Sequence, residues 1–176
     1  KVDELVLTES AACCLHLADL HADKGLIPAV GTAERAEAMR WLMFLTNTVQ
    51  PAFLRFFYPA RYTNDPNGAD LVQANAVDEL TALRSHISGK LGSGPFLQGN
   101  AFSIADIYLA MLSSWGTELP GAASWWADTK VAAHYDAVLA VRLVDRRTGK
   151  PVTDAVIFAK RLDMAPDAME EMATKV

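Results

Sequence analysis

The segment FLQGNAFSIAD, residues 96–106, constrains the fold of this chain more than any other stretch because it contains the start signals of a helix. Ser103 can cap that helix, and Asp106 can accept a hydrogen bond from the Ser103 backbone N–H. Phe102 and Ile107 can form a hydrophobic staple across the same turn. Almost all of the next ten residues are apolar, so we predict a capped helix inside a hydrophobic core. We interpret Ser103 and Asp106 as folding residues and not as reacting groups.

Further helices are predicted along most of the chain. Thr32 can cap a long helix, and Pro51 is expected to kink it because proline breaks the hydrogen bond to the carbonyl four residues earlier. Residues 69–91 predict an amphipathic helix, and residues 129–144 and 152–162 predict two more. The apolar stripe of the amphipathic helix consists of Val72, Ala76, Leu80, Leu83, Ile87 and Leu91.

The beginning of the chain predicts a strand, a tight turn and a helix. Residues 4–7, ELVL, have the composition of a strand, and the helix that starts near Ala11 is expected to stop at Gly25. A single strand is not stable without partners, and no other segment of this sequence supplies strands. We therefore expect that a preceding sheet is missing from this chain.

Composition and charge exclude several classes of function. The 176 residues carry a net charge of -5 without a run of Lys and Arg, which argues against nucleic acid or an anionic membrane as the main partner. No apolar run approaches the roughly 20 residues that span a bilayer. We therefore expect a cytoplasmic globular protein.

The cysteines and histidines indicate no metal site. Cys13 and Cys14 are adjacent, where a disulfide between them would be strained, so we interpret both as reduced packing residues. The histidines have no spacing that suggests a shared metal site or an acid–base pair, and we interpret them as surface or partly packed residues. They are His16, His21, His86 and His134.

Three segments in this order resemble the glutathione transferase superfamily. They are LVLTESA at residues 5–11, GLIP at residues 25–28 and FLQGNAFSIAD at residues 96–106. In that family the first segment contains the last strand and following helix of a thioredoxin-like domain. The second lies where the chain crosses between domains, and the third starts a central helix of an all-helical domain. The resemblance covers roughly residues 4–140 of this chain.

The resemblance implies a mainly α fold, in which an all-helical domain follows a remnant of an α/β thioredoxin-like domain. We expect three parts. They are the end of the thioredoxin-like, glutathione-binding domain in residues 1–24, an inter-domain linker in residues 25–31 and an all-α domain in residues 32–176.

The resemblance also implies that glutathione is a co-substrate. Family members hold its γ-glutamyl end with an acidic or amide side chain followed by a serine, which correspond to Glu9 and Ser10 here. A γ-glutamyl carboxylate could accept hydrogen bonds from the Ser10 hydroxyl and from the unsatisfied N–H groups of the helix start. Glu9 would then suit the neighbouring ammonium. The alternative is that Thr8 or Ser10 only caps the helix, with Glu9 stabilising its first turn electrostatically.

No catalytic residue is assigned in this chain. The family's activating Tyr, Ser or Cys, and the cis-proline segment that binds the glutathione backbone, would both precede Lys1. We therefore expect the chain as given to be inactive. The aromatic side chains from Trp41 to Tyr58, together with Trp115, suit an apolar pocket for the second substrate, but most of them are predicted to be core residues.

The last part of the sequence departs from the family pattern after about Val141. A basic cluster there is interpreted as a solvated face or a dimer edge, with contact to an anionic substrate as the alternative. It consists of Arg142, Arg146, Arg147 and Lys150.

The leading hypothesis is a homodimeric glutathione transferase that, when intact, conjugates the glutathione thiol to small hydrophobic electrophiles. Two alternatives remain. One is a non-catalytic interaction or stress-response module with the same fold, because fold alone does not determine function. The other is an unrelated helical bundle.

Overall fold

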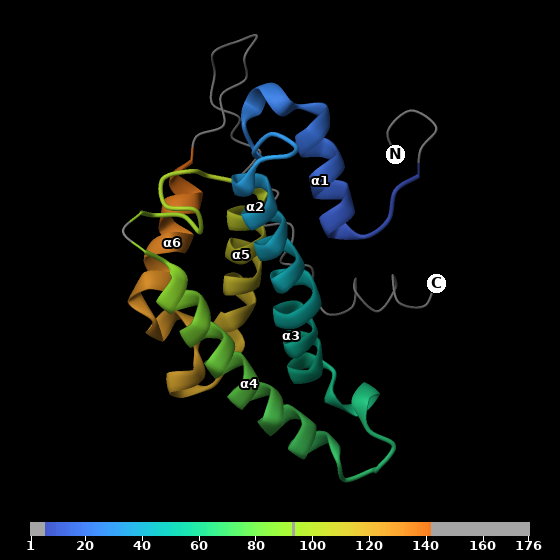
Figure 1. The fold of residues 1–176 in the computed structure, drawn as a ribbon. Coiled ribbons are helices and arrows are strands. Elements are labelled where there is room, and N and C mark those ends of the chain that lie inside the picture. The colour runs from blue at the N-terminus through green and yellow to red at the C-terminus, as the bar shows by residue number, and fades with distance from the viewer. Residues whose placement is uncertain (1–5, 93, 142–176) are drawn as a thin grey trace. The chain divides into compact units, whose positions relative to one another are not determined.

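Helices make up the regular structure of residues 6–92 and 94–141, which are the residues that the structure, a computed structural model, describes (Figure 1). The α-helices are α1 (Ser10–Leu20), α2 (Ala33–Phe44), α3 (Gln50–Phe57), α4 (Ala69–Lys90), α5 (Ile104–Trp115) and α6 (Thr129–Ala140). A π-turn spans Leu45–Val49, and 3-10 turns span Ala22–Lys24, Pro59–Tyr62, Gly116–Glu118, Gly121–Ala123 and Trp125–Ala127. The described part contains no strand, only two isolated bridges before α5, so the mainly α prediction is confirmed.

The chain divides into two compact units, Lys1–Val138 and Leu139–Val176. Only residues 139–141 of the second unit are described. The predicted helix at residues 152–162, the basic cluster and the end of the predicted helix at 129–144 lie outside the described residues.

The predicted strand at residues 4–7 is not seen in its described half. Val6 and Leu7 have no regular secondary structure, and Val6 is 73% exposed. The physical reason is that the described chain offers these residues no strand to pair with. The helix that follows is present as α1, and Gly25 ends the 3-10 turn after it in the left-handed conformation that glycine tolerates, at φ 64°.

The long helix predicted after Thr32 forms as α2, the π-turn and α3 in succession. Thr32 caps it as predicted, because its hydroxyl oxygen accepts a hydrogen bond from the Arg35 N–H at 3.1 Å. Where the sequence predicted a kink at Pro51, the structure has a π-turn that precedes this proline. In this turn the Gln50 N–H donates a hydrogen bond to the Leu45 carbonyl, five residues earlier in the chain. A proline cannot donate to the carbonyl four residues earlier, and a widened turn is one way to accommodate this.

The core lies around α5, which runs between the other helices in Figure 1. α2 and α1 pack against α5, and α3 packs against α4. Most of α5 is buried, as its apolar sequence predicts. The amphipathic helix predicted at residues 69–91 is confirmed as α4. Its stripe faces the core, with Ala76, Leu80, Ile87 and Leu91 buried.

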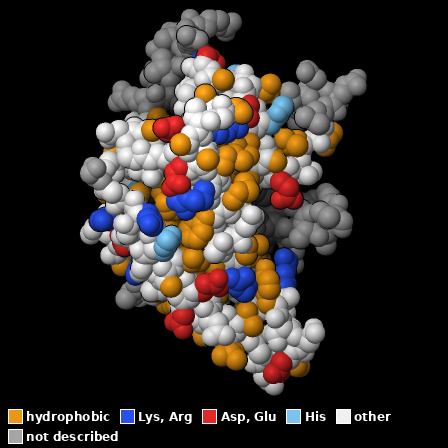
Figure 2. All heavy atoms as spheres, viewed as in Figure 1, with side chains coloured by type: hydrophobic (Ala, Val, Ile, Leu, Met, Phe, Trp, Pro, Cys, Tyr) orange, Lys and Arg blue, Asp and Glu red, His pale blue; other side chains and the backbone are white. Residues whose placement is uncertain are grey.

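The surface carries mixed charges. On the face seen in Figure 2, acidic and basic described side chains alternate among hydrophobic ones, without a large area of one sign. Within residues 6–92 and 94–141, no helix is both long and apolar enough to cross a membrane.

Candidate functional site

The start of α1 has a strained backbone at Glu9. Its φ of 69° and ψ of 114° make it the one non-glycine residue with a positive φ in the described chain. Such a conformation costs about 1–3 kcal/mol and is commonly retained at functional sites. Glu9 occupies the N-cap position, and no side chain caps the helix there. The structure thus places neither Thr8 nor Ser10 at the N-cap position of α1.

The N–H groups in the first turn of α1 have no partner within the helix. The first N–H that reaches back along the helix is that of Cys13, which donates to the Glu9 carbonyl at 2.9 Å. The preceding N–H groups lie at the positive end of the helix dipole, where a carboxylate is stabilised. Glu9 and Ser10 are both exposed beside them. The predicted site residues thus form one accessible group with acidic, hydroxyl and N–H functions.

The Ser10 hydroxyl is tied to the helical core by two hydrogen bonds in series. Ser10 Oγ lies 2.8 Å from the Tyr108 hydroxyl, and the Tyr108 hydroxyl donates to Gln50 Oε1 at 2.6 Å. Burial raises the pKa of the Tyr108 phenol, and the bond from Ser10 opposes this rise only in part. The phenol therefore keeps its proton at neutral pH.

Sequence reasoning missed Tyr108 and Gln50. Ser10 and Tyr108 are 98 positions apart, and Gln50 is 58 positions from Tyr108, so no local spacing reveals the contact. One signal was available. A tyrosine in an otherwise apolar buried helix needs a partner for its hydroxyl.

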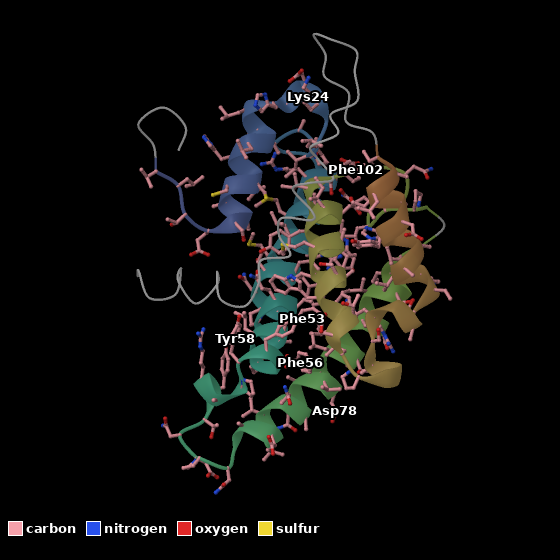
Figure 3. The ribbon with its side chains drawn as sticks, turned by 180° about the vertical axis from the view of Figure 1, so that it is seen from behind. Lys24, Phe53, Phe56, Tyr58, Asp78 and Phe102 are labelled. Carbon is pink, nitrogen blue, oxygen red and sulfur yellow. The ribbon has the colours of Figure 1, made fainter. Side chains whose placement is uncertain are left out.

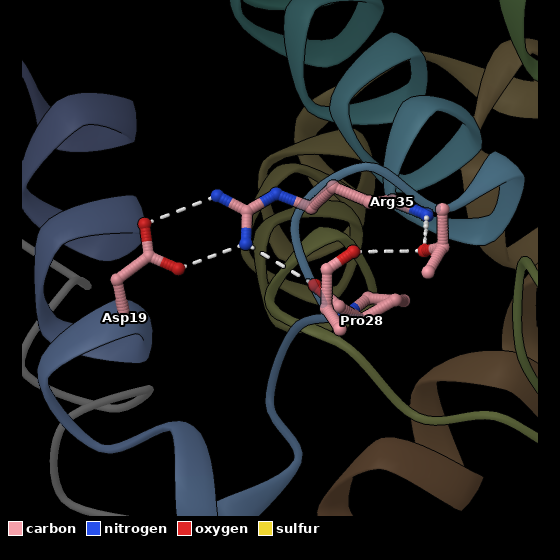
Figure 4. A network of polar contacts seen from close by, with 5 residues as sticks. Asp19, Pro28 and Arg35 are labelled. Carbon is pink, nitrogen blue, oxygen red and sulfur yellow. Dashed lines mark hydrogen bonds and ion pairs between the residues drawn. The ribbon is translucent and has the colours of Figure 1, made fainter.

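Two ties hold α1 to the helices that follow it. The Arg35 guanidinium donates to both carboxylate oxygens of Asp19, at 2.8 and 3.0 Å, and to the Pro28 carbonyl at 3.2 Å (Figure 4). The Ile104 N–H, at the start of α5, donates to the Leu26 carbonyl at 2.9 Å. These bonds connect α1 and the segment after it to α2 and α5, and so help to position Ser10 beside Tyr108.

The cysteines of α1 are free and partly buried, as predicted. Burial, and secondarily the neighbouring Cys13, raise the pKa of the Cys14 thiol. A raised pKa disfavours the thiolate, which is the reactive form. Cys14 is therefore a packing residue and not an activated nucleophile.

The capping motif of α5 is confirmed and extends further than predicted. The Asp106 carboxylate accepts hydrogen bonds from the N–H groups of Ser103 and Leu97, both at 2.8 Å. The Ser103 hydroxyl in turn accepts a hydrogen bond from the Ala105 N–H at 3.3 Å.

The two residues expected to form the hydrophobic staple differ in burial. The Phe102 ring packs on the Phe96 ring, with 5.1 Å between the ring centres, while Ile107 is 38% exposed.

The interpretation of His134 as a surface or partly packed residue was wrong. It is 2% exposed, and its Nε2 lies 3.1 Å from Asp106 Oδ1. The packing of α6 on α5 creates this pair across 28 positions, so local spacing could not predict it. Both side chains are inaccessible to a substrate, which makes the pair structural. In the described chain, no three His, Cys, Asp or Glu residues group to hold a metal ion.

The aromatic side chains of α2 and α3 mostly pack in the core, as predicted. Phe53 is fully buried, and its ring lies 5.9 Å from Trp115 and 5.2 Å from Trp125. Phe53, Phe56 and Tyr58 all come from α3 and its end, as Figure 3 shows. Tyr58 is only partly buried. The Arg61 guanidinium lies over the Tyr58 ring, with 4.5 Å between the guanidinium carbon and the ring centre.

No protein-family model matches the chain. An uncharacterised GST-like protein of Escherichia coli K12, YncG, is 32% identical over 135 residues, which are 76% of this chain and 62% of that protein. The glutathione S-transferase GST-4.5 of Xanthomonas campestris is 30% identical over 125 residues, 68% of this chain and 61% of that protein. The chain thus spans about three fifths of the length of these curated relatives.

Solved glutathione transferases share the fold. The glutathione S-transferase from Xylella fastidiosa matches with a TM-score of 0.70 and 26% identity, over 80% of this chain and 68% of that one. A sphingomonad glutathione S-transferase complexed with glutathione matches with a TM-score of 0.69 and 25% identity, over 90% of this chain and 69% of that one.

Proposed function

This chain belongs to the glutathione S-transferase superfamily, and from that membership we propose that it is part of an enzyme that conjugates the thiol of glutathione to small hydrophobic electrophiles. The observation that carries the proposal is the geometry at Glu9 and Ser10. A strained, exposed acidic residue precedes an exposed serine and the free N–H groups of a helix start. This arrangement suits an amino-acid group, which presents an ammonium and a carboxylate together.

In this proposal the γ-glutamyl end of glutathione binds at the start of α1. The first-turn N–H groups donate to its α-carboxylate, because they lie at the positive end of the helix dipole. The Glu9 carboxylate pairs with its ammonium, and Ser10 adds a hydrogen bond. Residues 1–24 are then the end of a thioredoxin-like domain, residues 25–31 a linker and residues 32–176 an all-α domain.

The helical domain would supply the pocket for the electrophile, with partly buried aromatic side chains such as Tyr58 as candidate contacts. We assign no thiol-activating residue within residues 1–176. By analogy with the superfamily, we propose that the protein forms a homodimer and that it is located in the cytoplasm.

The test uses the complete protein, meaning the full product of its gene. We expect it to bind to immobilised glutathione and to conjugate glutathione to an aryl halide such as 1-chloro-2,4-dinitrobenzene. Glu9→Ala and Ser10→Ala should each weaken glutathione binding about tenfold, the size expected when a hydrogen bond or contact to a charged group is lost. Glu118→Ala and Ser85→Ala, both exposed, are matched controls that should leave the affinity unchanged.

The outcomes separate the alternatives. Failure of the complete protein to bind glutathione would contradict the proposal. Binding without conjugation of any electrophile in a panel would favour the non-catalytic module. Residues 1–176 alone should show little or no conjugation, and robust turnover by them would contradict the absence of an activating residue.

A further inference from the structure

The connection between α3 and α4 contains the dipeptide Asn67–Gly68, a sequence that is chemically susceptible to deamidation. Because glycine has no side chain, its backbone nitrogen is unhindered and can attack the side-chain amide carbon of the preceding asparagine. Both residues lie outside the helices, at the lower end of α4 in Figure 1, and Asn67 is exposed. Exposed loops of this kind open locally far more often than the protein unfolds.

Glycine at residue 68 is required by space and not by backbone conformation. Its φ of -82° and ψ of -15° are ordinary for any residue. A Cβ at residue 68, however, would lie 2.5 Å from Thr63 Oγ1 and 3.2 Å from Asp65 Cβ. The Thr63 hydroxyl is held in this place because it accepts a hydrogen bond from the Asp65 N–H at 3.0 Å. Packing of the loop therefore keeps a glycine after Asn67.

A β-turn from Asp65 to Gly68 protects the dipeptide while the turn is closed. The Gly68 N–H donates to the Asp65 carbonyl at 3.0 Å, and the Asn67 N–H donates to Asp65 Oδ1 at 2.9 Å. The Gly68 nitrogen must lose its hydrogen before it can attack, so the first of these bonds has to break. One such bond favours the closed turn by about tenfold at most, which leaves an open fraction that can react.

We propose that Asn67 is a site of spontaneous deamidation in the folded protein, with water as the only co-reactant. The Gly68 nitrogen loses its proton to solvent and forms a bond to Asn67 Cγ, and ammonia leaves that carbon to give a cyclic succinimide. Water then adds to one of the two ring carbonyl carbons, and the bond from that carbon to the Gly68 nitrogen breaks. Breakage at Cγ gives aspartate, and breakage at the backbone carbonyl carbon gives isoaspartate.

The two products differ in their effect on α4. Isoaspartate inserts a methylene group into the main chain before Gly68, which prevents the turn to the Asp65 carbonyl from closing as before. Gly68 is the N-cap residue of α4, and its carbonyl accepts a hydrogen bond from the Val72 N–H at 3.1 Å. Isoaspartate should therefore loosen the first turn of α4. Aspartate keeps the backbone intact, and its charge is favoured by the positive end of the helix dipole.

The first experiment follows the asparagines of the complete protein by peptide mass spectrometry during prolonged incubation at neutral pH. Asn67 should be converted first. Asn64 and Asn75 are matched controls because both are exposed, Asn64 before Asp65 in the same loop and Asn75 before Ala76 in α4. An unincubated sample corrects for deamidation during digestion. Conversion of Asn67 no faster than that of Asn64 would overturn the proposal.

Hydrogen exchange of the separated products tests the effect on α4. The isoaspartate form should exchange the N–H groups in the first turn of α4 faster than the unmodified protein, whereas the aspartate form should not. Equal exchange in the isoaspartate form and the unmodified protein would overturn the predicted loosening of the helix start.

The second experiment tests whether opening of the turn limits the reaction. Asp65→Ala removes the side-chain acceptor of the Asn67 N–H, so the turn should open more often and Asn67 should deamidate up to about tenfold faster. Asp70→Ala removes an exposed carboxylate nearby and keeps that acceptor, so the rate should not change. Circular dichroism verifies that both variants are folded. Acceleration by both variants, or by neither, would overturn the protective role of the turn.

Discussion

Asp106 and His134 meet in the core, 28 positions apart in sequence, with 3.1 Å between Asp106 Oδ1 and His134 Nε2. Both side chains are buried, and Asp106 also accepts hydrogen bonds from the backbone of Leu97 and Ser103. One carboxylate therefore joins α6, the start of α5 and the loop before α5. Burying a carboxylate in a core lowers the stability of the folded state unless hydrogen-bond donors such as these surround it.

Asp106→Ala should lower the free energy of unfolding by about 3–5 kcal/mol, because it leaves several buried donors without an acceptor. Urea denaturation followed by circular dichroism measures the loss. Asp136→Ala is the matched control, since Asp136 is exposed on α6 two residues from His134. A loss below about 1 kcal/mol for Asp106→Ala would contradict the central role of this carboxylate.

The helices of this fold were predictable where the signal is local. The capping box of α5 and the stripe of α4 depend on residues three or four positions apart, and both were predicted correctly. The Thr32 cap is local in the same way. The π-turn before Pro51 was not predicted, because proline indicates a disturbance in the helix without specifying where the extra residue is placed.

The candidate site was predictable only in part. Glu9 and Ser10 came from the resemblance to a family, whereas the strain at Glu9 is a property of the folded backbone. Tyr108 and His134 acquire their partners through packing between distant helices. Periodicity places such residues on a buried face, but it does not say which polar group will meet them there.

The ion pair of Asp19 and Arg35 should make stability depend on pH. The hydrogen bond from Arg35, and then its charge, lower the pKa of Asp19 from its ordinary value of 3.8 in the folded state. The contribution of this pair to the free energy of unfolding is thus fully present above about pH 4, and it is lost as the pH falls through the lowered pKa of Asp19. Because Asp19 is exposed, added salt should also weaken the pair.

The test compares the wild type with Asp19→Asn. The variant should be less stable at pH 7, and the difference should shrink as the pH is lowered below 4, as measured by thermal unfolding across the pH series. A difference that stays constant down to pH 2 would show that the Asp19 charge is not the stabilising feature.

Gly116→Ala should destabilise the protein because Trp125 fills the space beside Gly116. A Cβ at residue 116 would lie 2.5 Å from Trp125 Cγ, and Trp125 is fully buried. Overpacking of this kind costs about 1–3 kcal/mol. Gly89→Ala is the matched control, because a Cβ at that position of α4 meets no atom within 4 Å. Gly89→Ala should stabilise the protein by about 0.5–1 kcal/mol. Urea denaturation measures whether each variant has a lower or a higher free energy of unfolding than the wild type.

Glu9→Gly should make the protein more stable while weakening glutathione binding. Glycine adopts a positive φ without the steric penalty that Glu9 carries at 69°, so relief of strain should exceed the entropy that glycine adds to the unfolded chain. The expected net gain is about 1 kcal/mol in the free energy of unfolding. Calorimetric titration with glutathione should show weaker binding, because the carboxylate proposed to pair with the ammonium is gone.

Glu9→Ala separates the two effects. It removes the same carboxylate but keeps a Cβ at the strained position, so it should lose affinity as Glu9→Gly does without gaining stability. Equal stabilisation by both variants would mean that the side chain and not the backbone is the source of strain. If both variants bind glutathione as tightly as the wild type does, the strained backbone of Glu9 serves something other than the γ-glutamyl group, because a conformation this costly is not needed to start a helix.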